Sequence, residues 1–208
     1  MTILLTGFTP FGGDAINPSW EVARRFSGRV IGGHRVETVE LPTTFAGAPR
    51  ALRAALRWHD PALTLCLGLA RGRRALSLER VAVNLIDARI PDNAGLQPID
   101  RPIRRRGAPA HFSPLPLKRM QAAVQAAGVS CELSLSAGSF VCNAVLYHLL
   151  AEGAHGGFLH LPDVEGYVPA GLDVPTVSFN EAVIGVERML AAALAPGADL
   201  RVVGGAVC

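Results

Sequence analysis

The sequence predicts one α/β domain with three layers, in which helices cover both faces of a largely parallel, possibly mixed, central sheet. Apolar runs of strand length alternate with stretches of helical period along the chain, which is the pattern of a sheet covered by helices. The chain has 208 residues, enough for one well-buried core, and 50% of them are hydrophobic. It contains no internal repeat, low-complexity tract or domain boundary, so we expect residues 1–208 to form a single domain.

The first part of the chain shows the alternation clearly. An apolar run predicts a strand over residues 2–8, and Asn17 followed by a proline predicts the N-terminus of a helix over residues 18–26. A second strand at residues 35–41 precedes a helix at residues 46–58 that is rich in Ala, Leu and Arg.

The middle of the chain departs from this alternation. Continuous apolar runs predict buried strands at residues 63–69 and 80–86. From residue 91 to residue 116 the sequence contains six prolines and no sustained period, which is unusual inside a compact domain. We therefore expect this connection to be a lid, a binding loop or an assembly element.

Regular elements return after this connection. Residues 117–127 have helical period and are followed by Gly128, a typical C-terminal stop of a helix. The remaining patterns predict a strand at residues 131–136, a helix at 141–152, a strand at 156–162 and a last helix near 181–194.

Composition and charge exclude several classes of protein. Lys and Arg number 20 against 17 Asp and Glu, and a net charge of +3 creates no field that would require a nucleic acid or an anionic membrane as partner. The basic run at residues 101–106 lacks interleaved aromatic residues, so we expect a solvated loop. No window reaches the roughly 18 apolar residues of a membrane span. The first residues also lack the features of a secretory leader, and we expect a soluble protein.

The cysteines indicate no structural framework. Cys66, Cys131, Cys142 and Cys208 show no C-x-x-C spacing, which favours neither a zinc site nor a set of disulfides. We expect no metal and no organic cofactor. A free thiol of low pKa is best protected in a reducing compartment, so we expect a cytoplasmic protein.

Cys142 is the strongest candidate for a reactive group. A strand pattern runs through a small-residue turn at residues 136–139 into the helix that begins at Cys142. Backbone N–H groups without helical partners favour an anion there, so we expect the thiolate to form more easily than the usual pKa of about 8.5 allows. His160, on a short apolar strand, is a candidate base for this nucleophile, and Glu79 is a candidate third member.

Each of these residues also has a simpler interpretation. A lone cysteine is usually a small buried hydrophobe. A histidine on an apolar strand, such as His160, is more often a core residue with satisfied hydrogen bonds than a base, and a glutamate such as Glu79 is more often a surface carboxylate. The residue types alone leave both interpretations open.

Two glycine-rich segments invite comparison with phosphate-binding loops. Residues 6–13 follow a strand but lack the Gly-Lys-Ser/Thr end of a P-loop and the spacing of a dinucleotide fingerprint, and residues 68–74 are equally unsuited. Phe8 and Phe11 lie in the first segment. Two aromatic side chains between a strand and a helix indicate either a small apolar pocket or a loop that plugs the core.

Five segments of the chain carry a resemblance to a known family. They are residues 6–13 together with 17–21, 79–84, 87–93, 136–143 and 157–162. In this order and combination they resemble pyroglutamyl peptidase type I, also called pyrrolidone carboxyl peptidase, and the similarity extends over nearly the whole chain. The resemblance implies a cysteine exopeptidase that removes N-terminal pyroglutamyl residues from peptides, on one α/β/α domain that commonly assembles as a homotetramer.

The resemblance also implies roles for individual residues in catalysis. Cys142 matches the nucleophile of the family, His160 its histidine and Glu79 its acidic member. Arg89 matches an arginine near the catalytic centre that could stabilise negative charge in the transition state.

A substrate pocket is implied in the same way. Phe8, Phe11 and Phe140 match the aromatic lining of a pocket for the lactam ring, and Asn17 matches a residue near it. Leu69 stands where members usually carry glutamine, in a Gly-Gln-Ala-Gly-Gly-Arg stretch. A leucine side chain can neither donate to the lactam carbonyl nor accept from its N–H. Selectivity is therefore weak if this position acts through its side chain and preserved if it acts through its backbone.

Three functions remain open on the sequence alone. The expected one is a pyroglutamyl peptidase. The alternatives are a related cysteine amidase that acts on another small cyclic or acyl amide, and a non-catalytic binding homologue that keeps the pocket. Asp163, where an aromatic residue is common in the family, is compatible with an altered substrate preference. Intact Cys142, His160 and Glu79 argue against the non-catalytic alternative.

Overall fold

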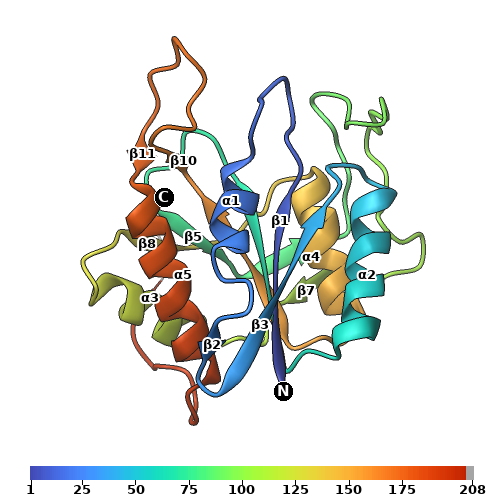
Figure 1. Cartoon of the computed structure of the whole chain (residues 1–208). Helices are drawn as coiled ribbons and strands as arrows, with labels where there is room; N and C mark the ends of the chain where they lie inside the picture. Colours follow the sequence, from blue (N-terminus) through green and yellow to red (C-terminus); the bar gives the residue numbers. More distant parts are fainter. Residues whose placement is uncertain (205–208) are drawn as a thin grey trace.

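The computed structural model describes residues 1–204, which form a seven-stranded central sheet between two layers of helices (Figure 1). The strand order is β2-β3-β1-β4-β9-β5-β8. These strands are β1 (Thr2–Phe8), β2 (Val30–Ile31), β3 (His34–Leu41), β4 (Leu63–Leu69), β5 (Leu76–Glu79), β8 (Cys131–Ser134) and β9 (Gly156–Leu161). Two pairs lie outside this sheet, namely β6 (Val81–Val83) with β7 (Ala110–Phe112) and β10 (Asp163–Val164) with β11 (Thr176–Val177).

The helices cover the two faces of the sheet separately (Figure 1). One face is covered by α1 (Pro18–Arg24), α3 (Leu117–Gln125) and α5 (Phe179–Leu194), and the other by α2 (Gly47–His59) and α4 (Val141–Ala151). Side chains alternate along each strand between two apolar cores. In β1, for example, Ile3 and Leu5 face the first core, whereas Leu4 and Phe8 face the second. The predicted three-layer α/β architecture is therefore confirmed.

The sheet is mixed. Strands β1, β3, β4 and β9 are parallel to their neighbours in this group, and β5 and β8 are parallel to each other. The two groups meet where β5 pairs antiparallel to β9. Because of this reversal, the end of β5 does not lie at the same edge of the sheet as the end of β9.

A crevice opens between β1 and β4. The chain leaves β1 through α1 toward β3 on one side and returns through α2 to β4 on the other side, so the strand order reverses at this point. Pairing of β1 with β4 ends at Thr6 and Cys66. After this point β1 makes no further pairing with β4, and the Phe8 N–H donates instead to Ser19 Oγ at 3.1 Å. Such a switch point at the carboxyl ends of parallel strands is where open α/β sheets bind ligands.

The turn between β1 and α1 is held by the predicted cap. Asn17 is the N-cap of α1, its side-chain oxygen accepts from the Ser19 N–H at 3.1 Å, and a proline occupies the first turn. The helix packs so closely on β1 that a Cβ on Gly7 would lie 2.5 Å from the backbone of Trp20. This close contact places the loop between residues 9 and 16 directly above the crevice.

The largest error of the sequence prediction lies after β4. The strand expected at residues 80–86 is observed only over Val81–Val83, because the chain leaves the central sheet after β5 at Arg80 and continues as β6 in the small sheet with β7. The Arg80 N–H donates to Ser134 O at 2.9 Å, and its carbonyl accepts from Ser113 N–H at 2.9 Å. Glu79 is therefore the last residue of a buried strand and not a surface carboxylate.

Most other predicted bounds differ from the observed ones by a few residues. The strands at residues 2–8 and 63–69 are confirmed with the predicted bounds. The last helix begins earlier than predicted, at Phe179, because Ser178 and Glu181 form a capping box. The connection from residue 91 to residue 116 contains the short strand β7. Strands β2, β10 and β11 were not predicted, since two residues each are too few to show a period.

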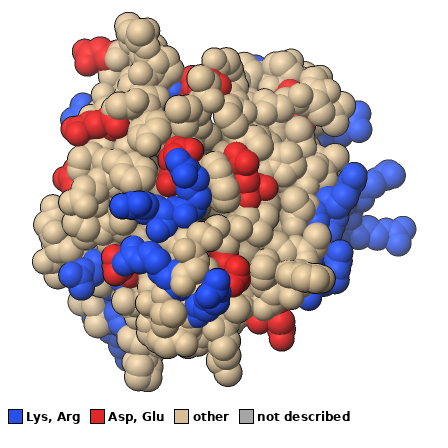
Figure 2. All heavy atoms as spheres, viewed as in Figure 1, with Lys and Arg blue, Asp and Glu red and all other residues tan. Residues whose placement is uncertain are grey.

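Charges of both signs are interspersed over the face of the molecule that carries α1 and α5, and basic side chains gather along the side formed by α2 (Figure 2). No helix within residues 1–204 combines the length and apolar character that a membrane span requires. Cys66, Cys131 and Cys142 are free thiols, whereas Cys208 lies outside the described residues.

Candidate active site

The structure places Cys142 at the start of α4, above the central part of the sheet. The turn expected at residues 136–139 does not leave the residue beside the strand that precedes it, because β8 is the outermost strand and residues 135–140 carry the chain back across the sheet before α4 begins. A Cβ on Gly68 would lie 3.1 Å from Cys142 Sγ, so the sulfur lies over β4. The glycine at this position makes the room that the thiol occupies.

Two neighbours of Cys142 fix the start of α4. The Asn143 side chain accepts from Val83 N–H at 3.0 Å and donates to the carbonyls of Val83 and Leu85 at 2.9 and 3.0 Å. Ser139 Oγ donates to Asp87 O at 2.7 Å. These bonds explain why the segment leading to Arg89 lies beside the thiol, and why buried Asn143 is polar.

His160 and Glu79 meet on the same face of the sheet as Cys142. In β9, His160 pairs with Gly68 of β4, so both residues face α4. The antiparallel register brings the end of β5 alongside, and His160 Nδ1 lies 2.7 Å from Glu79 Oε1. His160 is 4% exposed and Glu79 is fully buried. Because an ionised carboxylate only accepts hydrogen bonds, His160 carries its proton on Nδ1 and leaves Nε2 as the free nitrogen.

Arg73 supplies the counter-charge for Glu79. Its Nη1 lies 2.9 Å from Glu79 Oε1 as an ion pair that lacks hydrogen-bond geometry, while its Nη2 donates to Ser136 O at 3.0 Å. Isolated burial of a carboxylate would cost several kcal/mol, and a paired guanidinium offsets this cost. Arg73 was not predicted as a site residue, because nothing in the segment at residues 68–74 shows which of its arginines points inward.

Burial sets the protonation of the thiol and the imidazole. It lowers the pKa of His160, against the opposing effect of Glu79 and with a smaller contribution from the Arg73 charge. It also raises the pKa of Cys142 to about 12, and the negative charge of Glu79 acts in the same direction. The expected ready ionisation at a helix start is therefore wrong, because removal of water outweighs the helix end. Both shifts favour the neutral forms of the thiol and the imidazole near pH 7.

A cavity of about 380 Å³ lies in the crevice beside Cys142. Most of the site residues predicted from the sequence line it, namely Phe8, Phe11, Asn17, Leu69, Arg89, Phe140 and Cys142. His160 and Glu79 are not part of its lining, since they lie buried in the sheet. The ring centroid of Phe140 lies 5.1 Å from those of both Phe11 and Phe45. The structure thus brings the predicted residues together around one apolar cavity with a thiol at its wall.

Five further residues that were not predicted from the sequence also line the cavity. They are Gly12, Asp14, Thr43, Arg71 and Ile90. All lie in irregular connections, where no period or motif distinguishes lining residues from their neighbours. Thr43 is bound to the end of β1, since its N–H donates to Thr9 Oγ1 at 3.0 Å and its Oγ1 donates to Thr9 O at 2.9 Å. Arg71 contacts two carboxylates at the opposite wall.

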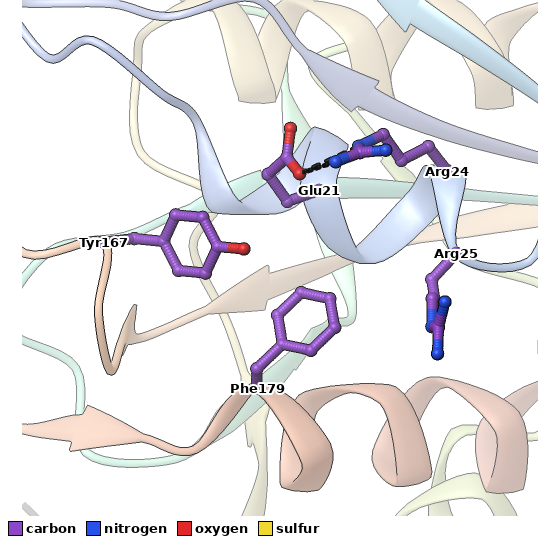
Figure 3. A pocket seen from close by; sticks show the side chains of 5 residues that line it. All are labelled: Glu21, Arg24, Arg25, Tyr167 and Phe179. Atoms are coloured by element: carbon purple, nitrogen blue, oxygen red, sulfur yellow. Dashed lines mark hydrogen bonds and ion pairs between the residues drawn. The ribbon is translucent and has the colours of Figure 1, made fainter.

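A polar hollow of about 340 Å³ lies away from the thiol, between α1, α5 and the loop that carries Tyr167 (Figure 3). Its lining contains an ion pair between Arg24 and Glu21 but no nucleophile beside a base. Within residues 1–204, no group of three or more His, Cys, Asp or Glu side chains is arranged to hold a metal ion. The cavity beside Cys142 is therefore the candidate active site.

Comparisons with known sequences agree with this site. Residues 1–195 match the family model described as pyroglutamyl peptidase. The pyrrolidone-carboxylate peptidase of Yersinia pseudotuberculosis is 40% identical, over 99% of this chain and 98% of that protein. The protein of the same name from Escherichia fergusonii is 41% identical, over 99% and 98%.

Solved structures show the same similarity. Pyroglutamyl peptidase I from Bacillus amyloliquefaciens matches with a TM-score of 0.92 and 34% identity, over 97% of this chain and 98% of that chain. Pyrrolidone carboxyl peptidase from Thermococcus litoralis matches with a TM-score of 0.89 and 33% identity, over 93% of both chains. Fold and sequence therefore agree over nearly the whole length.

The raised pKa of Cys142 predicts how its reactivity depends on pH. Because the thiolate is the nucleophile, alkylation by iodoacetamide should accelerate continuously between roughly pH 6 and pH 10. The measurement is the initial rate of modification at residue 142, followed by peptide mass spectrometry, with Cys142→Ala as the control for site assignment. A rate that reaches its plateau below pH 7 would show a resting thiolate and contradict the neutral pair.

Proposed function

Because this chain belongs to the pyroglutamyl peptidase family, we propose that it is a cysteine exopeptidase that removes N-terminal pyroglutamyl residues from peptides. One observation supports this most strongly. The Cys142 thiol stands at the wall of an aromatic cavity, on the same face of the sheet as the hydrogen-bonded pair His160 and Glu79. An uncharged lactam ring suits such a lining, because its faces are apolar and only one amide needs polar partners.

In the proposed mechanism, Cys142 Sγ attacks the carbonyl carbon that joins the lactam ring to the next residue. His160 Nε2 accepts the thiol proton during this attack, so no free thiolate has to exist beforehand. Glu79 accepts the hydrogen bond from His160 Nδ1–H, which orients the ring, and its negative charge stabilises the imidazolium that forms. His160 then donates the proton to the leaving amine. Water hydrolyses the resulting thioester, with His160 acting again as the base.

Two groups are proposed to stabilise the negative oxygen of the intermediate. The first intrahelical bond of α4 runs from Ala144 N–H to Phe140 O, so the N–H groups of residues 141–143 have no partner within the helix. These donors lie at the attacking sulfur itself. Arg89 is exposed at the cavity, and its guanidinium supplies positive charge.

The backbone of Leu69 is proposed to recognise the lactam. Ala70 N–H donates to Leu161 of β9 at 2.8 Å. Backbone groups of a strand point to alternate sides, so the N–H and C=O of Leu69 point toward β1. Since β1 has already separated from β4 there, these groups face the crevice. A lactam presents its C=O and N–H on one edge, and one extended residue offers the matching donor and acceptor. In this arrangement the backbone at position 69 recognises the lactam, and the side chain contributes little to recognition.

We also propose that the protein works as a homotetramer in the cytoplasm. The support is the resemblance to the family together with apolar side chains that the single chain leaves uncovered. Leu85 after β6, Leu96 and Ile99 in the long connection, and Phe112 of β7 are exposed. Exposed apolar groups of this kind often mark contacts between chains.

The proposed function predicts selective cleavage of fluorogenic pyroglutamyl amides over alanyl, prolyl and glutamyl amides. Cys142→Ser should abolish turnover while the fold is retained, and Cys131→Ser is the matched control that should keep it. His160→Ala should slow acylation by a factor on the order of 10² to 10⁴ if His160 is the base. Equal cleavage of all four amides would favour the broader cysteine amidase, and an active Cys142→Ser variant would exclude the thiol mechanism.

Leu69→Gln tests which group at this position recognises the ring. If the backbone carries the recognition, kcat/KM for a pyroglutamyl amide should change by less than about threefold, well under the roughly 1.4 kcal/mol that a tenfold effect represents. Steady-state kinetics with pyroglutamyl and alanyl amides measure this, and Leu69→Met is the control for side-chain size. A gain of tenfold or more in pyroglutamyl selectivity would instead assign recognition to the missing glutamine amide.

A further inference from the structure

A substrate bound as proposed would cross the strand ends in a definite direction. The wall that suits the ring includes Phe8 at the end of β1 and Thr43 just after β3. His160, which donates the proton to the leaving amine, lies on β9, on the other side of β4. The peptide released by cleavage therefore lies toward β9 and the segment that follows it.

Arg71 forms the wall of the cavity on that side. Its Nε donates to Asp163 Oδ1 at 3.0 Å and its Nη2 donates to Asp14 Oδ2 at 2.8 Å. The Asp163 side chain is 2% exposed and also accepts from Gly72 N–H at 3.2 Å. Two carboxylates thus hold the guanidinium through Nε and Nη2, and within residues 1–204 neither of these bonds engages Nη1. This nitrogen is available to donate to a backbone carbonyl of a bound peptide.

A second hollow of about 320 Å³ continues from this wall, and Asp14 lines both spaces. Its sides are formed by two loops, at residues 13–16 and 166–169. Ala15, Ile16, Val168 and Pro169 make the lining largely apolar. Ile16 is 44% exposed, so a large apolar side chain stands uncovered beside the hollow.

Hydrogen bonds and an aromatic contact hold the start of the outer loop against its neighbours. Tyr167 N–H donates to Val164 O at 3.0 Å, and Glu165 N–H donates to Val177 O at 2.9 Å. The Tyr167 ring lies 6.0 Å from that of Phe179, and Figure 3 shows it reaching from the loop toward the hollow between α1 and α5. Because this aromatic contact ties the loop to α5, the hollow is a preformed groove and not a gap between free loops.

We propose that the groove between residues 13–16 and 166–169 binds the part of the substrate that follows the scissile bond. The occupant is an extended peptide with an apolar side chain within the first residues after pyroglutamate, and Arg71 donates to its backbone at the entrance. The inference rests on the proposed function, since it assigns the leaving peptide of that reaction. The continuity of the groove with the cavity through Asp14 identifies this occupant.

The test compares substrates of increasing length. One substrate is a pyroglutamyl coumarin amide without any peptide beyond the scissile bond, and the others are pyroglutamyl-alanyl-leucyl-alanine amide and its aspartyl counterpart. The quantity measured is the ratio of kcat/KM for each peptide to that for the coumarin amide. The leucyl peptide should give a ratio about tenfold above that of the aspartyl peptide, a difference of about 1.4 kcal/mol. Ile16→Asp and Val168→Asp, on opposite walls, should each remove most of this preference.

Val30→Asp is the matched control, because Val30 is exposed on β2, outside the lining of both spaces. It should keep the leucyl preference of the wild-type chain, and circular dichroism should show all three variants folded. Two results would overturn the proposal that this groove binds the leaving peptide. One is an equal kcat/KM ratio for the two peptides in the wild-type chain, and the other is an unchanged leucyl preference in both groove variants. Failure of the wild-type chain to cleave even the coumarin amide would overturn the proposed function, and with it this inference.

Discussion

The buried pair of Glu79 and His160 is the interaction on which the site depends. A carboxylate with no exposed surface requires a positive partner, and Arg73 at 2.9 Å is that partner. The pair exists only because β5 runs antiparallel to β9, which brings the last residue of β5 beside the middle of β9. A fully parallel sheet would place the carboxylate at another edge. The reversal between β9 and β5 is therefore a condition for the proposed chemistry.

The cavity follows from a different property of the same sheet. Strands β1 and β4 separate where the strand order reverses, and Ser19 takes the hydrogen bond of Phe8 that β4 would otherwise have received. The opening exposes backbone groups on one side, and the loop above it supplies aromatic side chains. Gly68 then leaves space for the sulfur beside both features. Nucleophile, base and ring-binding wall are thus placed by three neighbouring strands, and the groove beyond Arg71 extends this line toward β10.

Much of the fold could be predicted from the sequence, because long apolar runs such as residues 2–8 and 63–69 have a clear pattern. Seven of the nine predicted site residues line one cavity, and the other two form the buried pair. Strand β5 was not predicted, since an alternation of only four residues is too short to identify a strand. Arg71 and Arg73 were missed because only the folded chain shows which arginine meets which carboxylate. The thiol pKa was predicted in the wrong direction, since burial at Cys142 depends on the packing of α4 and β4, which lie far apart in the sequence.

The most direct test of this account is the protonation of His160 in the resting protein. Nitrogen-15 NMR of the folded chain, assigned by comparison with a His160→Gln variant, reports which ring nitrogen carries the proton at each pH. The structure predicts a neutral ring at pH 7 with the proton on Nδ1, facing Glu79, and a pKa below the ordinary 6.5. An imidazolium at pH 7 with both nitrogens protonated would contradict it, because the resting state would then be a thiolate and imidazolium pair.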